Sequence, residues 1–342
     1  MQAALVGVTG YAGIILYQLL KNHPNVEQVH IYDHKISKNA PLSEVAPIFK
    51  NDSSVVAPYD PTTIMGADDV VFFATSSGVT SQLSVPYLEK HFPVIDLSGD
   101  MRLKTEQAYE KWYHKPSAPV AALQAATYGL AEFDSVKDAT YVANPGCYAT
   151  ATLLGLAPLV QKHLINVKSI IVDAKSGTSG AGKKLSASTH FTEVNDNLQI
   201  YKPNQHQHIP EIVQELQKWD PSVTTLQFMT TLIPVTRGIM STIYAQVNPG
   251  VDEQTLLAAF HDTYDDQPFI NFTGTDLPTI KQVVGTNNCD IGIAYNPETR
   301  FVMVDSVIDN MLKGAAGQAV QNFNALFGFS KTAGLNLQPA LI

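Results

Sequence analysis

The chain has 342 residues, 45% of them hydrophobic, and a formal net charge of −9. This length favours two domains with sizeable cores, and the acidic balance excludes a basic surface for nucleic acid or for a membrane. Two cysteines form no disulfide framework, and the sequence shows neither a signal-peptide pattern nor an apolar run of transmembrane length. We expect a soluble cytoplasmic protein with no nucleic-acid partner and no membrane partner.

A short apolar run at residues 3–8 leads into the glycine-rich turn GVTGYAG and then into IILYQLLKN, which has helical periodicity. The order strand, turn, helix suits a dinucleotide pyrophosphate, because glycines allow close approach and the helix N-terminus offers N–H groups and a positive dipole. The spacing differs from the usual G-x-G-x-x-G, so an ordinary βα turn is the alternative. The cofactor-binding residues predicted here are Gly7, Thr9, Gly10, Tyr11, Ala12 and Gly13.

A second predicted strand, residues 26–33, ends at Asp33. An acid at this distance from the glycines usually binds the ribose hydroxyls of NAD. Lys35, Ser37 and Lys38 follow and could instead hold the 2′-phosphate of NADP. The residues by themselves leave NAD and NADP open.

Further strands are predicted at 69–74, 93–97 and 139–143. Thr75 and Ser76 come directly after the first of these, at the carboxyl edge where such sheets place ligands. Loop hydroxyls are also common on any protein surface, so cofactor binding and simple exposure are both compatible with this pair.

Cys147 lies in ANPGCYATAT, directly after a proline-glycine turn and at the start of a predicted helix. Helix N-terminal N–H groups and the helix dipole stabilise a thiolate, and the same groups can serve a developing oxyanion. The alternative is a small buried hydrophobe, which we assign to the other cysteine, Cys289. The pattern favours Cys147 as a nucleophile.

A nucleophilic cysteine needs an acid–base partner, and the segment HQHIPE supplies His206 and His208. In an extended segment the two side chains would point to opposite faces, so we expect only one to reach Cys147 and the other to be solvated. A metal site is the alternative, but H-x-H without a third ligand is a weak pattern, and no metal is predicted.

The loop KSGTSGAGKK, residues 175–184, follows another predicted strand and combines hydroxyls, lysines and backbone N–H groups suited to an anion. It lacks P-loop spacing, so ATP hydrolysis is not implied, and a flexible surface loop is the alternative. Arg237, beside a glycine at a strand edge, suits a carboxylate or phosphate, although a surface ion pair is nearly as compatible.

A thiol nucleophile, a nicotinamide-type site and anion-binding groups combine in the reductive dephosphorylation of an acyl phosphate. In this chemistry the thiolate displaces phosphate, hydride reduces the resulting thioester, and the thiohemiacetal collapses to an aldehyde.

Over nearly its whole length the chain resembles the N-acetyl-γ-glutamyl-phosphate reductases of arginine biosynthesis, within the wider semialdehyde dehydrogenase group. The motifs that carry the resemblance are GVTGYAG, VIDLSGDMRL, YGLAEF, NPGCYATA, SGTSGAGKK, HQHIPEI, IPVTRGI and DNMLKGAAGQAVQNFN. The resemblance implies NADP as cofactor, a helix over 309–330 packed on the first domain, Cys147 as nucleophile and the first histidine, His206, as acid–base group.

Two departures from the family pattern stand out. The family usually has an arginine where this chain has Gln207, and a histidine where it has Ser77. Neither departure touches the proposed nucleophile.

The expected fold is α/β, with a doubly wound Rossmann-type NADP-binding domain (1–146 and 309–342) and an α+β catalytic and oligomerisation domain (147–308). The expected assembly is a homodimer or homotetramer, and the partners are the acyl phosphate substrate and phosphate. The alternatives are an aspartate-semialdehyde dehydrogenase-type enzyme and a non-redox cysteine hydrolase on the same fold. The remaining predicted site residues are Gly177 and Asn310 for the cofactor, and Arg102, Asn144, Ser179 and Arg237 for the substrate.

Overall fold

The computed structural model describes residues 1–339, and the chain divides into two compact units. Unit 1 comprises Met1–Pro145 and Ala315–Asn336, and unit 2 comprises Gly146–Gly314 with the described residues from Leu337 onward. The chain re-enters unit 1 at Ala315 rather than at residue 309. The intervening residues belong to unit 2 because Asn310 bonds to Gly238, directly before β12, and Gly314 packs against Cys147.

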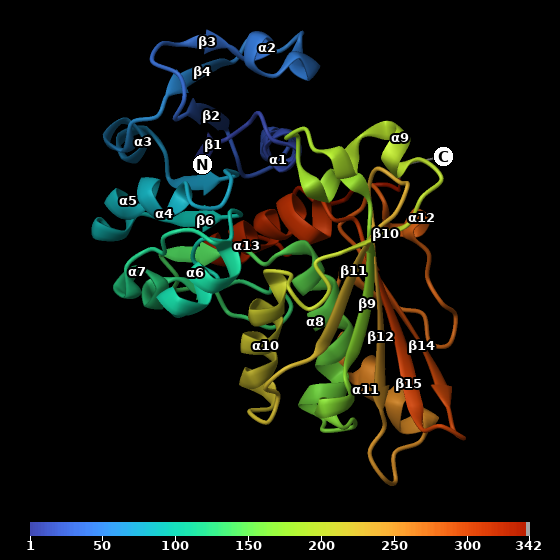
Figure 1. Ribbon diagram of the computed structural model, residues 1–342. Coiled ribbons are helices and arrows are strands. Elements are labelled where there is room, and N and C mark those ends of the chain that lie inside the picture. The colour runs from blue at the N-terminus through green and yellow to red at the C-terminus, as the bar shows by residue number, and fades with distance from the viewer. Residues whose placement is uncertain (340–342) are drawn as a thin grey trace. The chain divides into compact units, whose positions relative to one another are not determined.

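Unit 1 is built on an eight-stranded sheet in the order β3-β4-β2-β1-β5-β6-β8-β7 (Figure 1). β1 pairs in parallel with both β2 and β5, so the strand order reverses at β1 in the manner of a doubly wound fold. The strands are β1 (Gln2–Val6), β2 (Gln28–Asp33), β3 (Ala40–Pro41), β4 (Val55–Pro58), β5 (Val70–Phe73), β6 (Val94–Asp96), β7 (Thr127–Tyr128) and β8 (Tyr141–Ala143). The Rossmann-type fold expected for the first domain is confirmed.

The helices of unit 1 lie between these strands and at the end of the chain. They are α1 (Tyr11–Lys21), α2 (Leu42–Val45), α3 (Pro61–Ala67), α4 (Thr80–Leu83), α5 (Val85–Glu89), α6 (Glu106–Tyr113), α7 (Val120–Ala125) and α13 (Gly317–Phe327). α13 packs against α1 and β6 although it is far from both in the sequence; Figure 1 draws α13 in red, α1 in dark blue and β6 in cyan. The continuous helix expected over 309–330 is wrong at both ends: residues 310–311 form a turn, a π-helical turn covers Leu312–Ala316, and the α-helix ends at Phe327.

Unit 2 contains a mixed seven-stranded sheet in the order β10-β11-β9-β12-β15-β14-β13. β12 and β15 form its antiparallel centre, while β9 pairs in parallel with β11. The strands are β9 (Ile171–Ser176), β10 (Gln199–Tyr201), β11 (Gln227–Leu232), β12 (Ile239–Gln246), β13 (Ile270–Phe272), β14 (Cys289–Asn296) and β15 (Phe301–Ile308). This is the α+β architecture expected for the second domain.

Helix α8 (Cys147–Gln161) is the central helix of unit 2. It is buried along nearly its whole length and packs against β12, β15, α10 and α11. A helix that is apolar all round belongs in a core. The remaining helices of the unit are α9 (Phe191–Val194), α10 (His208–Trp219), α11 (Glu253–Tyr264) and α12 (Ile280–Val283). The packing of α8 in the core therefore fixes the position of Cys147, its first residue.

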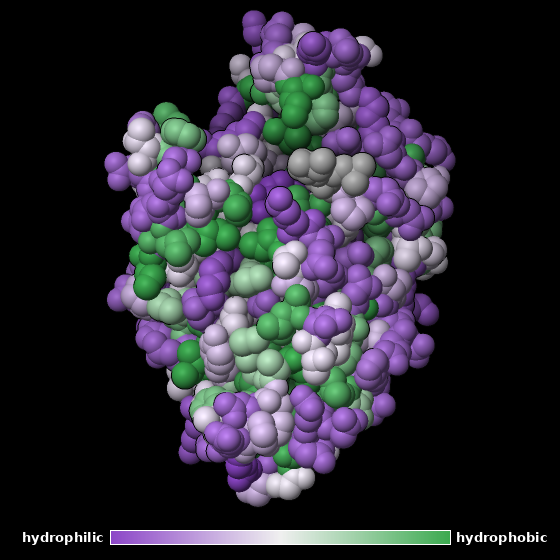
Figure 2. All heavy atoms as spheres, turned by 90° about the vertical axis from the view of Figure 1, so that its right-hand side faces the viewer, coloured by the Kyte–Doolittle hydropathy of each residue, from purple (hydrophilic) through white to green (hydrophobic). Residues whose placement is uncertain are grey.

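The two faces of the unit 2 sheet differ in burial. Along β9 and β12 the side chains that face α8 are buried, whereas Ile171 and Tyr244 on the opposite face are 43% and 36% exposed. Figure 2 looks onto that side of the molecule and shows hydrophobic and pale side chains exposed among hydrophilic ones. Among the described residues, no helix has the length and apolar character needed to cross a membrane.

Candidate active site

Cys147 is the first residue of α8 and is half-buried. Gly146 precedes it as the N-cap, with extended backbone (φ −74°, ψ 151°) and no side-chain bond to the first turn. The first N–H groups of a helix have no partners within the helix, so they are oriented to stabilise a thiolate or an oxyanion. Cys289, by contrast, is fully buried in β14, with its Sγ 3.3 Å from Ser306 Oγ, as expected for a small core residue.

His206 and His208 lie on the same side of the chain, so the expectation that they point to opposite faces is wrong. Both side chains are buried, and their ring centroids are 4.7 Å apart. The reason is local: Gln207 is helical (φ −62°, ψ −13°), Ile209 N–H donates to His206 O, and α10 begins at His208. The segment is therefore a turn into a helix, and the alternation of an extended chain does not apply to it.

The protonation state of His206 follows from its surroundings. Burial lowers the pKa of His206 well below its ordinary value of 6.5, and the neighbouring His208 and Lys202 lower it further, so the ring is neutral at pH 7. The backbone N–H of His208 donates to His206 Nδ1 at 3.2 Å. Because Nδ1 is the acceptor, the single ring proton is on Nε2, and His206 presents an N–H donor from that atom.

Tyr148 connects the cysteine to the histidines. It follows Cys147 directly, and its ring packs edge-on against both imidazoles, with centroids 5.2 Å from His206 and 6.0 Å from His208. Its hydroxyl is 2.8 Å from that of Tyr201. Burial raises the pKa of both tyrosines, so both hydroxyls stay protonated at neutral pH.

Glu211 is a site residue that the sequence interpretation missed. It lies in the first turn of α10, is fully buried, and accepts a hydrogen bond from Gly146 N–H at 2.7 Å. It therefore links the histidine segment directly to the residue before Cys147. An acid three residues after His208, at the start of an amphipathic helix, is the signal that could have identified it.

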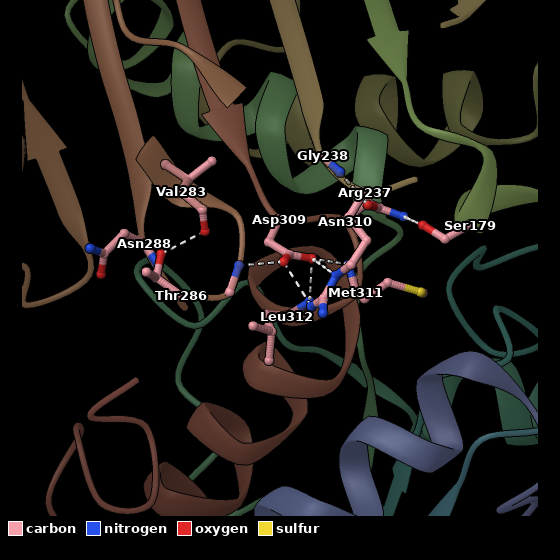
Figure 3. Close-up of polar contacts among 11 residues, drawn as sticks. Ser179, Arg237, Gly238, Val283, Thr286, Asn288, Asp309, Asn310, Met311 and Leu312 are labelled. Carbon is pink, nitrogen blue, oxygen red and sulfur yellow. Dashed lines mark hydrogen bonds and ion pairs between the residues drawn. The ribbon is translucent and has the colours of Figure 1, made fainter. Parts of the chain in front are cut away.

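Arg237 precedes β12 and forms an ion pair with Asp309, with Nη2 2.7 Å from Oδ2 (Figure 3). The side chain of Asp309 is fully buried, whereas that of Arg237 is 29% exposed. One edge of the guanidinium is therefore engaged inside the protein, and the exposed remainder of the side chain is what could meet a substrate anion.

Ser179 and Asn310, predicted to bind substrate and cofactor respectively, bond to each other. Asn310 Nδ2 donates to Ser179 Oγ at 3.0 Å, and Asn310 Oδ1 accepts from Gly238 N–H at 2.7 Å (Figure 3). Gly177, at the start of the same loop, donates its N–H to Gly238 O. The SGTSGAG loop is thus fastened to the start of β12 and to the residues after β15, so it is not a free surface loop.

The predicted pyrophosphate-binding turn connects β1 to α1. The helix begins at Tyr11, earlier than the sequence suggested, with Gly10 as an N-cap that provides no side-chain bond. Cβ atoms added at Gly7 and Gly13 would lie 2.7 Å from Ala74 O and 2.1 Å from Gly7 O, whereas one at Gly10 would meet nothing closer than 3.9 Å. Two glycines therefore permit close packing of the backbone, and the third leaves room in front of the helix N-terminus.

At the end of β2, Asp33 is buried and its Oδ1 accepts from the N–H of Lys35 at 2.8 Å. One oxygen of the acid is therefore occupied by its own turn. Ser37 and Lys38 follow in exposed positions.

The loop after β5 is held from two sides. The carboxylate of Asp100 accepts from Gly78 N–H at 2.7 Å and Ser81 N–H at 2.9 Å, and Lys115 Nζ donates to Ser77 Oγ at 2.9 Å. Thr75 Oγ1 is paired with Thr80 Oγ1, while Ser76 is exposed. The predicted residues Thr75 and Ser76 thus belong to a loop whose shape is fixed.

Arg102 and Asn144, both predicted to bind substrate, are buried in unit 1. Arg102 Nε donates to Asn144 O at 2.8 Å, and Asn144 Nδ2 donates to Ala315 O at 3.1 Å. Asn322 Nδ2 donates to Asn144 Oδ1 at 3.0 Å. These bonds join the end of β8 to the segment that enters α13, so both side chains have a structural role irrespective of any ligand.

Two family models match the chain. The semialdehyde dehydrogenase NAD binding domain matches residues 2–143, and the semialdehyde dehydrogenase dimerisation domain matches residues 147–310. Aspartate semialdehyde dehydrogenase II of Vibrio cholerae has the same fold, with a TM-score of 0.70 at 17% identity over 96% of this chain and 98% of that one. These matches define the class as a semialdehyde dehydrogenase-type oxidoreductase.

Curated relatives narrow this class. The N-acetyl-gamma-glutamyl-phosphate reductase of Limosilactobacillus fermentum is 56% identical over 100% of both chains. The N-acetyl-gamma-glutamyl-phosphate reductase 2 of Lactiplantibacillus plantarum is 54% identical over 99% of both. The chain belongs to the N-acetyl-γ-glutamyl-phosphate reductase family.

Proposed function

We propose that the protein catalyses the NADPH-dependent reductive dephosphorylation of N-acetyl-γ-glutamyl phosphate to N-acetylglutamate 5-semialdehyde, a step of arginine biosynthesis. The observation that carries the proposal is a half-buried cysteine at the uncapped N-terminus of a core helix, tied to a buried histidine pair, in a chain 56% identical to a reductase of that name. Unit 1 would bind the cofactor, and unit 2 would carry the catalytic residues.

The residues of unit 1 fit a dinucleotide cofactor. The open position at Gly10, in front of the start of α1, is a cradle that a larger side chain would fill. Ser37 and Lys38 are exposed beyond β2 and would hold a 2′-phosphate, which favours NADP, while Asp33 already uses one oxygen in its own turn. NADPH, when bound, supplies the hydride that the reaction consumes.

Cys147 would act as the nucleophile. Its thiolate attacks the γ-acyl carbon, a carbon–sulfur bond forms, and the carbon–oxygen bond to phosphate breaks with its electron pair leaving on phosphate. The thioester carbon then accepts hydride, and the tetrahedral oxyanion collapses as the carbon–sulfur bond breaks, which returns the thiolate and releases the aldehyde. The N–H groups at the start of α8 stabilise both the thiolate and the oxyanion.

His206 would stabilise the oxygen of the thiohemiacetal by a hydrogen bond. As a neutral ring with its proton on Nε2, it donates a hydrogen bond to that oxygen as charge develops, and the proton stays on Nε2 in both directions of the reaction. His208 holds His206 in this tautomer through its backbone N–H. We therefore assign the role of the catalytic histidine to His206, which acts as a hydrogen-bond donor, with His208 in a supporting role.

The anionic groups of the substrate would meet the SGTSGAG loop and Arg237 in unit 2. The ion pair with Asp309 fixes the orientation of Arg237, and a fixed guanidinium fork suits bidentate recognition of phosphate or carboxylate. Ser179 is held by Asn310 in the same loop. In unit 1, Arg102 and Asn144 remain proposed substrate-binding residues, joined to each other by the bond from Arg102 Nε to Asn144 O.

We further propose a cytoplasmic homodimer or homotetramer that associates through the open face of the unit 2 sheet. The support is the exposed apolar surface on that face, including Ile171 and Tyr244, within the segment matched by a dimerisation-domain model. Light scattering of the protein and of a Tyr244→Lys variant tests this proposal. A charge at an apolar interface should weaken association and so lower the measured mass of the assembly.

The substrate assignment is tested by comparing the phosphate-dependent oxidation of N-acetylglutamate semialdehyde and aspartate semialdehyde. The proposal expects kcat/KM to favour the acetylated substrate by at least roughly 100-fold, because a site that binds an acetylamido group loses paired contacts with the shorter substrate. The reverse preference would assign the protein to the aspartate-semialdehyde chemistry. Acyl hydrolysis that needs no nicotinamide would identify a hydrolase.

A further inference from the structure

Asp309 carries a fully buried carboxylate that no step of the proposed reaction uses. It directly follows β15 and binds several donors at once (Figure 3). One oxygen accepts from the N–H groups of Met311 (2.8 Å) and Leu312 (3.3 Å). The other accepts from Gly285 N–H at 2.8 Å and lies 2.7 Å from Arg237 Nη2. A buried charge with this many donors fixes the geometry of every segment that supplies one.

The segment that Asp309 holds most closely is the turn that follows it. The N–H groups of Met311 and Leu312 bond to the carboxylate, and Gly314 N–H bonds to the backbone oxygen of Asp309 at 3.0 Å. A bond across five residues opens a π-helical turn, which here covers Leu312–Ala316. π turns are rare, and they are found frequently at functional sites.

This turn packs directly against the nucleophile. A Cβ atom added at Gly314 would lie 2.7 Å from Cys147 Cβ, 3.2 Å from Cys147 Cα and 3.2 Å from Ile308 Cδ1. The backbone at Gly314 is therefore in contact with the residue that carries the thiol. A displacement of the turn would therefore change the backbone contact that supports Cys147.

We propose that Asp309 is a positioning residue for Cys147: its carboxylate fixes the π-helical turn whose Gly314 holds the cysteine at the helix N-terminus. Arg237 contributes by neutralising the buried charge, which links the substrate-binding arginine to the cysteine through one carboxylate. This inference rests on the proposed role of Cys147 as nucleophile. It adds a residue for which the sequence interpretation offered no role.

The test is the pH dependence of iodoacetamide alkylation at Cys147, followed by mass spectrometry of its peptide in the full-length protein. In Asp309→Asn the cysteine loses its alignment with the helix N–H groups. The midpoint of the rate profile should then shift to higher pH by about half a unit or more. In the same variant kcat should fall roughly 10- to 100-fold, and KM should rise as well, because Arg237 loses the carboxylate that orients it.

Asp68→Asn is the matched control, because Asp68 is also a buried carboxylate but bonds to His30 in unit 1. Its alkylation profile should match the parent. Gly314→Ala leaves the Asp309 carboxylate in place and presses on Cys147 directly, so it should reproduce the shift. Should Asp309→Asn fail to fold, Asp309→Glu keeps the charge, displaces the same turn by one methylene and should give the shift.

Several results would overturn the proposal. They are an unshifted midpoint in a folded Asp309 variant, an equal shift in Asp68→Asn, and a shift confined to Gly314→Ala. The alkylation needs no substrate and no cofactor. A wrong substrate assignment would therefore leave the alkylation result unchanged. If Cys147 of the parent protein did not react as a thiolate, both its role as nucleophile and the positioning role of Asp309 would be contradicted.

Discussion

The carboxylate of Glu211 accepts a hydrogen bond from the backbone N–H of Gly146 at 2.7 Å. Glu211 belongs to the first turn of α10, which begins at His208, and Gly146 is the N-cap of α8, which begins at Cys147. This buried bond is one of the contacts that join the helix beginning at His208 to the helix that begins at the proposed nucleophile. We expect the bond to help set the relative positions of the thiol and the imidazoles.

Glu211→Ala should therefore lower kcat strongly while the protein remains folded. Removal of the carboxylate leaves the Gly146 N–H without its acceptor at a cost of about 1–3 kcal/mol, and the misplaced site should lose roughly 10- to 100-fold in kcat. Glu215→Ala is the matched control, because Glu215 is buried one turn later in α10 and pairs with Lys218. Steady-state kinetics alongside thermal unfolding would contradict this account if both variants lost activity equally.

The two histidines should not be equivalent in catalysis. His206→Ala removes the Nε2–H donor and should lower kcat about 10²- to 10³-fold, the usual cost of losing one donor to a developing oxyanion. His208→Ala retains the backbone N–H that fixes the tautomer of His206, so its loss should be markedly smaller. Kinetics of the two variants under identical conditions make the comparison, and a larger loss at His208 would exchange the two roles.

The buried neutral His206 also predicts how stability depends on pH. Its folded pKa lies below the unfolded value of 6.5, so in acid the unfolded chain binds a proton that the folded protein does not. This contribution lowers stability as the pH falls through the unfolded pKa, by up to about 1.4 kcal/mol per pH unit. His206→Gln should remove it.

The measurement is the free energy of unfolding by denaturant, for the parent and for His206→Gln, at about pH 7.5 and about pH 5.5. The parent should lose about 1 kcal/mol more than the variant over this range. His23 is also buried with a lowered pKa, and it is common to both proteins, so the difference isolates His206. Parallel losses would mean that His206 is protonated in the folded state.

Two glycines of the nucleotide-binding turn should differ in how much stability they lose on substitution by alanine. At Gly13 an added Cβ would lie 2.1 Å from Gly7 O, so Gly13→Ala should destabilise unit 1 by several kcal/mol or prevent folding. At Gly10 there is room, so Gly10→Ala should cost under about 1 kcal/mol. It should nevertheless weaken NADPH binding, measured by nicotinamide fluorescence. Unchanged cofactor affinity would place the pyrophosphate elsewhere.

Local sequence patterns were sufficient to predict many of the strands and helices. Buried apolar runs located five of the eight strands of the first sheet and missed the short strands β3, β4 and β7, and the proline-glycine turn before Cys147 located the start of α8. Such features depend on residues a few positions apart, so their physics can be read along the chain. The prediction that His206 and His208 point to opposite faces was wrong, because Gln207 between them has a helical backbone and the segment is not extended.

Contacts between distant segments could not be predicted in the same way. Arg237 was compatible with a surface ion pair or an anion site, and only the fold shows its partner, Asp309, 72 residues away. Glu211 likewise meets Gly146 across 65 residues. Neither pair has a sequence spacing that would indicate contact, because both depend on how the strands and helices of unit 2 are ordered.

The central claim is that Cys147 forms a covalent thioester during an NADP-linked reaction. The most direct test is the absorbance of reduced nicotinamide when purified protein is mixed with N-acetylglutamate semialdehyde, phosphate and NADP⁺. The account predicts reduction that requires phosphate and that falls by several orders of magnitude in Cys147→Ser, because a serine hydroxyl is hardly ionised at neutral pH. Near-full activity in Cys147→Ser, or reduction without phosphate, would contradict the thioester route.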